Sequence, residues 1–312
     1  MLAIIIGLAI GIGLPIQTSI NSRLKTSVGS PFVASLISFT LGTTFLAIIT
    51  LIVDKSLFFP VTIMLKQPLW LWLGGVFGVI YLTANILLFP KLGSVQTVIM
   101  PILGQIIMGL LIDDFGLFKS LVKPLTLTRI LGAILVLVGV IGSVSINEII
   151  NKRHDRVLAT TTVQNKTWPF RLMGILAGMF SASQTAINGH LGVVLQSTVK
   201  AAFVSFFVGI VVLIIIVATL HPQIKLLAVN GKNPWWMWIG GLIGAIFVLG
   251  NVYLVPIIGT GLAVVIVLVG LITGSLLIDQ FGWFDSKKNP ITFAQIISLL
   301  IMISGVIIIR VL

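Results

Sequence analysis

The chain alternates between long apolar runs and short polar segments. A run of about 20 apolar residues is enough to cross the hydrocarbon core of a bilayer. Because lipid offers the backbone no hydrogen-bond partners, such runs are expected to be helices, whereas the strands of a membrane barrel would be shorter and would alternate in polarity. We predict ten transmembrane helices, at Leu2–Ile20, Pro31–Val53, Leu69–Phe89, Gly93–Ile112, Leu127–Ile146, Phe170–Asn188, Ala201–Leu220, Trp235–Val255, Gly259–Ile278 and Phe293–Val311.

The composition supports an all-α membrane protein. Of the 312 residues, 58% are hydrophobic and only 8% are charged. A soluble domain carries roughly 25% charged residues, so this chain cannot cover itself with a water-compatible surface. We therefore expect a multi-pass protein of the cell (inner or plasma) membrane, surrounded by the lipid bilayer.

Charge and cysteine content exclude several functions. The net charge is +12, but the cations lie in short loops between the apolar runs, as the positive-inside bias predicts, so no nucleic-acid partner is expected. The chain has no cysteine, which excludes disulfides and cysteine-ligated metals. No acid–base pair, nucleophile constellation or metal-ligand spacing occurs, so we predict neither an enzyme nor a cofactor.

An internal repeat organises the whole chain. The phrase Gln-Thr-x-Ile-Asn at Gln17–Asn21 returns at Gln184–Asn188, an offset of 184 − 17 = 167 residues. Further phrases recur at an offset of 166, in the pairs Gly74–Gly78 and Gly240–Gly244, and Leu111–Gly116 and Leu277–Gly282. The protein therefore consists of two copies of one unit.

Each copy has five apolar runs, and this odd number sets the topology. We expect a first five-helix repeat at residues 1–146, a polar linker at 147–168 and a second repeat at 169–312. The second copy must enter the membrane from the opposite side, and inverted repeats are typical of secondary transporters. Twelve of the 19 Lys and Arg residues lie on the linker side, which favours a cytoplasmic linker and external termini.

The repeated amides are the first candidates for a substrate site. Gln17 and Asn21 are four residues apart, as are Gln184 and Asn188, so each pair shares one helix face. Buried amides need hydrogen-bond partners, which a polar solute could supply at the interface of the repeats. The alternative is that these amides hold the helices together.

The third and eighth runs carry a second set of polar residues. Asn85 and Asn251 occupy equivalent places, each shortly before a proline. Gln96 and Gln105 add polarity to the fourth run, and the second copy has no counterpart of them. We include Asn85 and Asn251 among the predicted substrate-binding residues and regard the fourth run as a further candidate for lining a cavity.

Acidic residues are scarce, and none lies clearly in mid-membrane. Asp113 and Asp279 are equivalent and each follows about 20 apolar residues, which places them near the interface. A carboxylate is disfavoured by the dipole at the C-terminus of a helix, so its recurrence needs an explanation. The two aspartates are candidates for coupling transport to a proton or cation, or they are anchors at the helix ends.

Several phrases resemble a known family. They are Leu14–Asn21, Gly29–Pro31 leading to Ser38 and Phe39, Trp72–Gly75, and Leu111–Asp113. Together they resemble the YdcZ-type branch of the drug/metabolite transporter superfamily, in its fused ten-helix form, across nearly the whole chain. The resemblance implies movement of small molecules across an inner or plasma membrane, often export. Other ten-helix relatives suggest cytoplasmic termini, against the charge count. Small multidrug-resistance relatives carry a glutamate in their first span, where this chain has Gln17 and no acid.

We therefore expect a secondary transporter, an exporter of a small metabolite or drug-like solute, that works by alternating access between two inverted repeats. The uncharged candidates suit a neutral or zwitterionic solute. A passive channel is the alternative function. The sequence leaves open whether the protein is a monomer or a homodimer.

Overall fold

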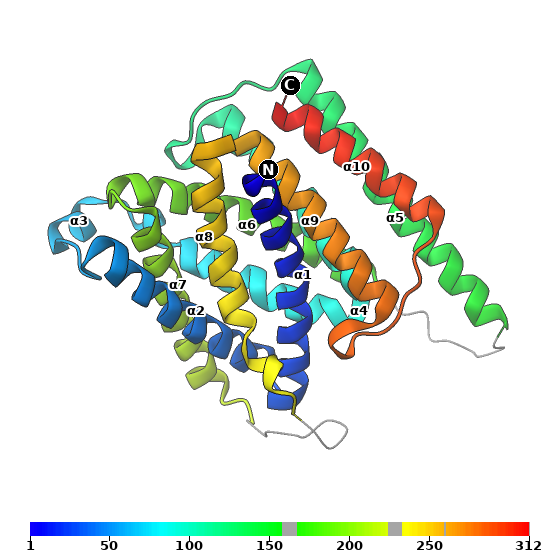
Figure 1. The fold of residues 1–312 in the computed structure, drawn as a ribbon, viewed down its shortest axis with the longest axis horizontal. Coiled ribbons are helices and arrows are strands. Elements are labelled where there is room, and N and C mark those ends of the chain that lie inside the picture. Colours follow the sequence, from blue (N-terminus) through cyan, green and yellow to red (C-terminus); the bar gives the residue numbers. More distant parts are fainter. Residues whose placement is uncertain (158–166, 224–232, 259, 312) are drawn as a thin grey trace.

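The computed structural model describes residues 1–157, 167–223, 233–258 and 260–311, and all regular structure in these residues is helical (Figure 1). The α-helices are α1 (Leu2–Val28), α2 (Pro31–Asp54), α3 (Val61–Lys66), α4 (Gly74–Phe115), α5 (Leu127–Val157), α6 (Trp168–Val194), α7 (Thr198–Leu220), α8 (Gly240–Ile258), α9 (Thr260–Phe281) and α10 (Phe293–Val311). Short 3₁₀ turns precede or follow several of them, at η1 (Leu69–Trp72), η2 (Leu117–Lys119), η4 (Trp235–Trp238) and η5 (Trp283–Asp285).

Equivalent capping residues start the second helix of each repeat. The side chain of Ser30 accepts a hydrogen bond from the Val33 N–H at 3.4 Å, and Ser197 accepts one from the Lys200 N–H at 3.0 Å. A serine in this position satisfies a backbone donor that the helix itself leaves unpaired. The repeat thus preserves the local signals for helix initiation as well as the apolar runs.

Helix α4 contains two of the predicted spans, joined at Gly93. This glycine has φ +76° and ψ 176°, which breaks the helix. A left-handed φ is readily adopted only by glycine, so the residue type allows one span to follow the other without a loop. The third and fourth predicted runs are therefore two helices that meet at Gly93.

The predicted spans are confirmed as helices, with longer boundaries in places. Five helices, α1, α2, α4, α7 and Val264–Phe281 of α9, are long and apolar enough to cross a membrane by length and composition. Shorter apolar stretches lie at Leu127–Ser143, Gly240–Asn251 and Phe293–Ile309. The linker differs from the expectation: α5 continues to Val157, because residues 147–157 include good helix formers that extend an existing helix at little cost.

The contact between α5 and α10 shows how the repeats are related. These equivalent helices lie side by side at one edge of the molecule (Figure 1). Gly132 packs on Gly305, and Gly139, further along α5, packs on Ser298, which is earlier in α10. The helices are therefore antiparallel. The repeat makes position 132 equivalent to 298 and position 139 equivalent to 305. The two-fold axis therefore converts one of these contacts into the other.

Helices α2 and α7 form the same kind of self-matching contact. The ring of Phe39 lies against Gly209, and the ring of its equivalent, Phe206, lies against Gly42. The two ring centroids are 5.0 Å apart. A two-fold axis that pairs equivalent helices in antiparallel fashion runs perpendicular to them, so the repeats are inverted with respect to the membrane.

The outward faces of the bundle are apolar. On α5, α2 and α7 the exposed large side chains include Leu131, Ile134, Ile141, Ile48, Ile52, Ile214 and Ile215. In water such a surface would aggregate, whereas in a bilayer it faces hydrocarbon. The surface of the structure therefore agrees with the membrane location expected from composition.

The close contact between α2 and α7 gives a stability test. A Cβ on Gly209 would lie 2.5 Å from Cδ1 of Phe39. We expect Gly209→Ala to destabilise the protein by about 1–3 kcal/mol, as overpacking does, and to lower its apparent Tm in detergent. Gly189→Ala is the control, because nothing lies within 4 Å of the new Cβ. Equal melting temperatures for the two variants would contradict this account.

Candidate functional site

The repeated amides meet glycines of the opposite repeat. A Cβ on Gly240 of α8 would overlap Oδ1 of Asn21, and one on Gly244 would lie 2.5 Å from Nε2 of Gln17. Only a glycine at each position leaves room for an amide this close to the backbone of α8. Gly240 and Gly244 of the second repeat are four residues apart, and the two amides of the first repeat, also four apart, pack against them.

The same contact occurs a second time across the pseudo-two-fold axis. A Cβ on Gly74 of α4 would overlap Oδ1 of Asn188, and one on Gly78 would lie 2.7 Å from Nε2 of Gln184. The prediction that these four amides lie at the interface of the repeats is therefore matched by their positions. Whether they bind a solute stays a prediction.

The hydrogen bonds of the amides are incomplete. Nδ2 of Asn21 donates to Oγ of Ser38 at 3.2 Å, but the buried Oδ1 atoms of Asn21 and Asn188 have no conventional partner among the described residues. Each Oδ1 faces the Cα–H groups of a glycine, and weak C–H···O contacts of this kind recur between closely packed helices. Gln17 is 8% exposed, and its amide forms no hydrogen bond with the described residues, although its polar atoms are not fully buried.

The other two predicted amides lie on α4 and α8. Asn85 is buried, and its Oδ1 has no hydrogen-bond partner. Asn251 is half-buried, and its Nδ2 donates to the carbonyl of Phe247, one turn earlier in the same helix, at 2.9 Å. Among the described residues, no hydrogen bond joins Asn85 or Asn251 to the Gln-Asn pairs, so the six predicted residues do not form one connected network.

The recurring aspartates have different partners. Asp279 is 1% exposed, and its carboxylate accepts hydrogen bonds from the N–H groups of Ser94 at 2.7 Å and Val95 at 3.1 Å. These N–H groups start the second half of α4, just after the break at Gly93. A carboxylate at the N-terminus of a helix is favourable, so Asp279 caps a helix of the other repeat while ending its own. This explains an acid at a position that its own helix dipole disfavours.

Asp113 instead forms an ion pair within its own repeat. Its carboxylate contacts Arg129, whose equivalent in the second repeat is Gln295. Gln295 accepts a hydrogen bond from the Thr292 N–H at 2.8 Å. Within the described residues Asp279 has no ion-pair partner. The two coupling candidates are thus equivalent in sequence but differ in electrostatic surroundings.

Arg171 is a buried residue to which the sequence pattern gives no role. It lies in the first turn of α6, is 9% exposed and donates from Nε to Oε1 of Gln96 at 3.2 Å. Gln105 donates to Oγ of Ser181, also on α6, at 3.1 Å. The polar residues that only the first repeat has in this run are therefore satisfied by the second repeat. In the sequence, the presence of Gln96 in the first repeat alone indicated that it needs a polar partner of its own.

One end of the molecule has an ion pair between the repeats. Nε of Arg23, at the C-terminal end of α1, lies 2.8 Å from Oδ2 of Asp285 in η5. At the equivalent positions of the other end stand His190 and Lys119, two basic residues. His190 stacks on Trp70 at 5.7 Å between ring centroids. The ion pair is therefore present at the linker side and is replaced by two bases at the other.

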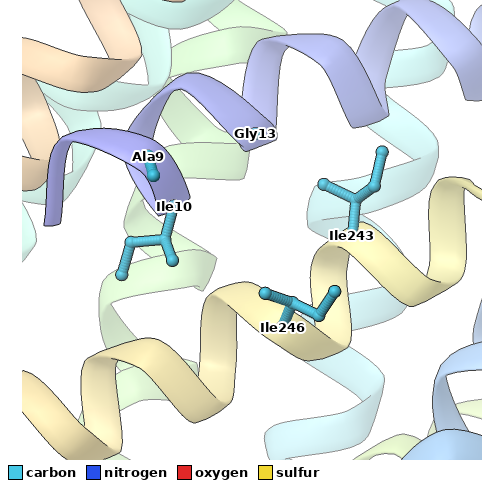
Figure 2. Close-up of a pocket in the computed structure, with 5 residues that line it drawn as sticks. All are labelled: Ala9, Ile10, Gly13, Ile243 and Ile246. Carbon is cyan, nitrogen blue, oxygen red and sulfur yellow. The ribbon is translucent and has the colours of Figure 1, made fainter. Parts of the chain in front are cut away.

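A small apolar cavity lies between α1 and α8. Its volume is about 150 Å³, and it is lined by Ala9, Ile10, Gly13, Ile243 and Ile246. Figure 2 shows the isoleucine side chains directed into the space between the two helices. Gly13 precedes Gln17 by one helical turn, and Ile243 is next to Gly244, which contacts Gln17. The cavity therefore lies one helical turn away from Gln17.

Two five-helix units related by an inverted two-fold axis, with apolar outer faces, define a multi-pass membrane protein of the transporter class. Residues 2–142 and 169–308 each match the family described as "Putative inner membrane exporter, YdcZ". The chain belongs to this family, within the drug/metabolite transporter superfamily, and is a membrane transporter of the inner membrane.

Other comparisons add only the fold. A solved crystal structure matches 98% of this chain and 97% of its own chain, with a TM-score of 0.53 and 17% sequence identity. At that identity the likeness shows a shared fold and nothing about substrate. No curated protein matches the chain.

The contact between amide and glycine can be tested by a double-mutant cycle. Gly240→Ala alone should overpack against Asn21 and destabilise the protein by about 1–3 kcal/mol. In the variant Asn21→Ala, Gly240→Ala the overlap is removed, so we expect a coupling free energy of about 0.5–3 kcal/mol from the unfolding curves. The equivalent pair, Asn188 with Gly74, should give a similar coupling. Additive effects at both pairs would show that these contacts do not join the repeats.

Proposed function

We propose that the protein is a secondary transporter that exports a small metabolite or drug-like solute by alternating access between its two inverted repeats. Membership in an exporter family supports transport. Inverted repeats support the mechanism, because two similar halves can exchange the conformations of their ends. The channel remains the alternative, since inverted architectures can also form a passive pore.

The observation that carries the proposal is a difference in burial at the two ends. At the C-terminal end of α1, on the linker side, Asn21, Ser22 and Arg23 are buried. Their equivalents at the end of α6 are Asn188 and His190, which are half-buried, and Gly189, which is exposed. In each of its two states, an alternating-access transporter is closed at one end and open at the other. The greater burial at the end of α1 agrees with a conformation that is closed on the linker side.

The polar ties between the repeats have the same distribution. The ion pair of Arg23 with Asp285 and the bonds of Asp279 to Ser94 and Val95 all join the first repeat to the second near the linker side. We propose that these contacts hold that end closed. Opening it would require both sets to break while the opposite end closes.

Of the two coupling candidates, Asp279 suits the role better. Protonation of Asp279 would weaken the two hydrogen bonds that its carboxylate accepts. The start of the second half of α4, just after Gly93, would then no longer be held by α9. Asp113 instead forms an ion pair with Arg129 of its own repeat and makes no contact with the helix break at Gly93 among the described hydrogen bonds. We therefore propose Asp279 as the proton- or cation-responsive residue, with Asp113 as a structural ion pair.

Counterflow in proteoliposomes tests this function. The assay follows uptake of radiolabelled candidate solutes into vesicles preloaded with the same unlabelled solute. A carrier gives saturable counterflow, whereas a channel gives flux that does not saturate. We expect Asp279→Asn to lower the counterflow rate by at least about tenfold, because the amide cannot accept both N–H bonds while its NH₂ faces donors. Asp113→Asn is the matched comparison and should lower the rate less. Wild-type rates in Asp279→Asn would rule out the coupling role.

Cysteine accessibility tests which end is closed, and the chain is suited to it because it has no native cysteine. Ser22→Cys and Gly189→Cys place the probe at equivalent positions of the two ends. With a membrane-impermeant maleimide and purified protein, we expect rapid labelling at 189 and slow labelling at 22. Adding Asp285→Asn should raise the labelling rate at 22, and the swap Arg23→Asp with Asp285→Arg should lower it again. Equal labelling of the two sites in the unmodified background would contradict the proposed conformation.

A further inference from the structure

The residues that line the cavity between α1 and α8 have different counterparts in the other half of the molecule. The pseudo-two-fold axis relates α1 to α6 and α8 to the first part of α4, so it relates Gly13 to Phe180 and Ile243 to Phe77. Phe77 and Phe180 contact each other, with ring centroids 5.1 Å apart. Two aromatic rings thus stand on one side of the axis where a glycine and an isoleucine stand on the other.

The size and lining of the cavity define what it can hold. Its volume of about 150 Å³ is comparable to that of a cavity that binds benzene, although this one is open on one side. Its five lining residues carry no polar side-chain atom and no charge, so a charged group would be strongly disfavoured there. Ala9 and Ile246 are exposed at its rim, which opens it toward the lipid-facing surface.

Beside the cavity lies a polar group that lacks a partner. Gln17 is more than nine-tenths buried, and its amide makes no hydrogen bond to the described residues. It lies one turn beyond Gly13, against Gly244, which follows Ile243. Neither polar atom of this amide is fully enclosed, so a ligand can reach it and supply a donor or an acceptor.

We infer that this cavity, together with the amide of Gln17, is a binding site for a neutral amphipathic solute with an apolar group no larger than a benzene ring and a hydrogen-bonding group attached to it. That the bound solute is also the transported one rests on the proposed function. The apolar group lies among Ile10, Ile243 and Ile246, and the polar group meets Gln17. Because Phe77 and Phe180 fill the equivalent space, each chain has one such site, off the pseudo-two-fold axis.

Benzamide is the probe, since it combines a ring of the right size with an amide; acetamide is the comparison, since it lacks the ring. Binding is measured by equilibrium dialysis of the radiolabelled compounds against the purified wild-type protein, with protein-free micelles subtracted. We expect saturable binding of one benzamide per chain and, for acetamide, an affinity at least about tenfold lower, because the apolar contribution is absent.

The pseudo-symmetry supplies matched variants. Gly13→Phe with Ile243→Phe copies the aromatic pair into the cavity and should weaken benzamide binding at least about tenfold. Phe180→Gly with Phe77→Ile copies the cavity onto the other half and should raise the stoichiometry toward two per chain. Gln17→Leu should weaken benzamide binding while leaving the cavity in place. If the double phenylalanine variant does not fold, Ile246→Phe fills the cavity from its rim and makes the same prediction.

The outcomes separate this inference from the transport function. Absence of benzamide binding to the wild type, equal affinity for acetamide, or unchanged binding in the filled variants would overturn the site. Benzamide binding that the filled variants abolish, in a protein without counterflow, would support the site and refute transport. Counterflow in the wild type, together with benzamide binding that the filled variants leave unchanged, would support transport and refute the site.

Discussion

The close approach of helix backbones in lipid is the constraint on which the structure depends. Hydrocarbon is as apolar as leucine, so apolar side chains gain little by turning from lipid to protein. Helices must instead be held by van der Waals contact at short range and by polar groups between them. Both means are combined where Asn21 lies on Gly240 and Asn188 lies on Gly74. These contacts join α1 to α8 and α6 to α4, two of the surfaces between the repeats.

Within this symmetric frame, the two copies differ at a few positions that change the local contacts. Arg23 corresponds to His190, Arg129 to Gln295, and Gly13 to Phe180. The first difference puts an ion pair at one end only, the second leaves Asp279 without an ion-pair partner in the described residues, and the third opens a cavity in one half. An exact duplicate would have two equivalent ends, whereas these substitutions make the two ends and the two halves different.

The sequence predicted the helices well, because apolar run length and repeat offsets report properties that each segment has alone. It also placed the four repeated amides at the interface of the repeats, since a shared helix face follows from a spacing of four. It gave no role to Arg171, and it left open why an aspartate ends the ninth run. Both answers depend on contacts with residues far away in the chain, Gln96 and Ser94.

The amino-acid sequence by itself determined the membrane class, the ten spans, the duplication and its inversion, because hydropathy and an odd number of spans are properties of the linear chain. Only the tertiary structure decided that the amides face glycines, that Asp279 caps the second half of α4, and that Phe77 and Phe180 close a space that Gly13 and Ile243 leave open. The physical reason is that helix packing brings together residues separated by a whole repeat. Which atoms then meet depends on the angle and register of the helices, and no local pattern encodes these.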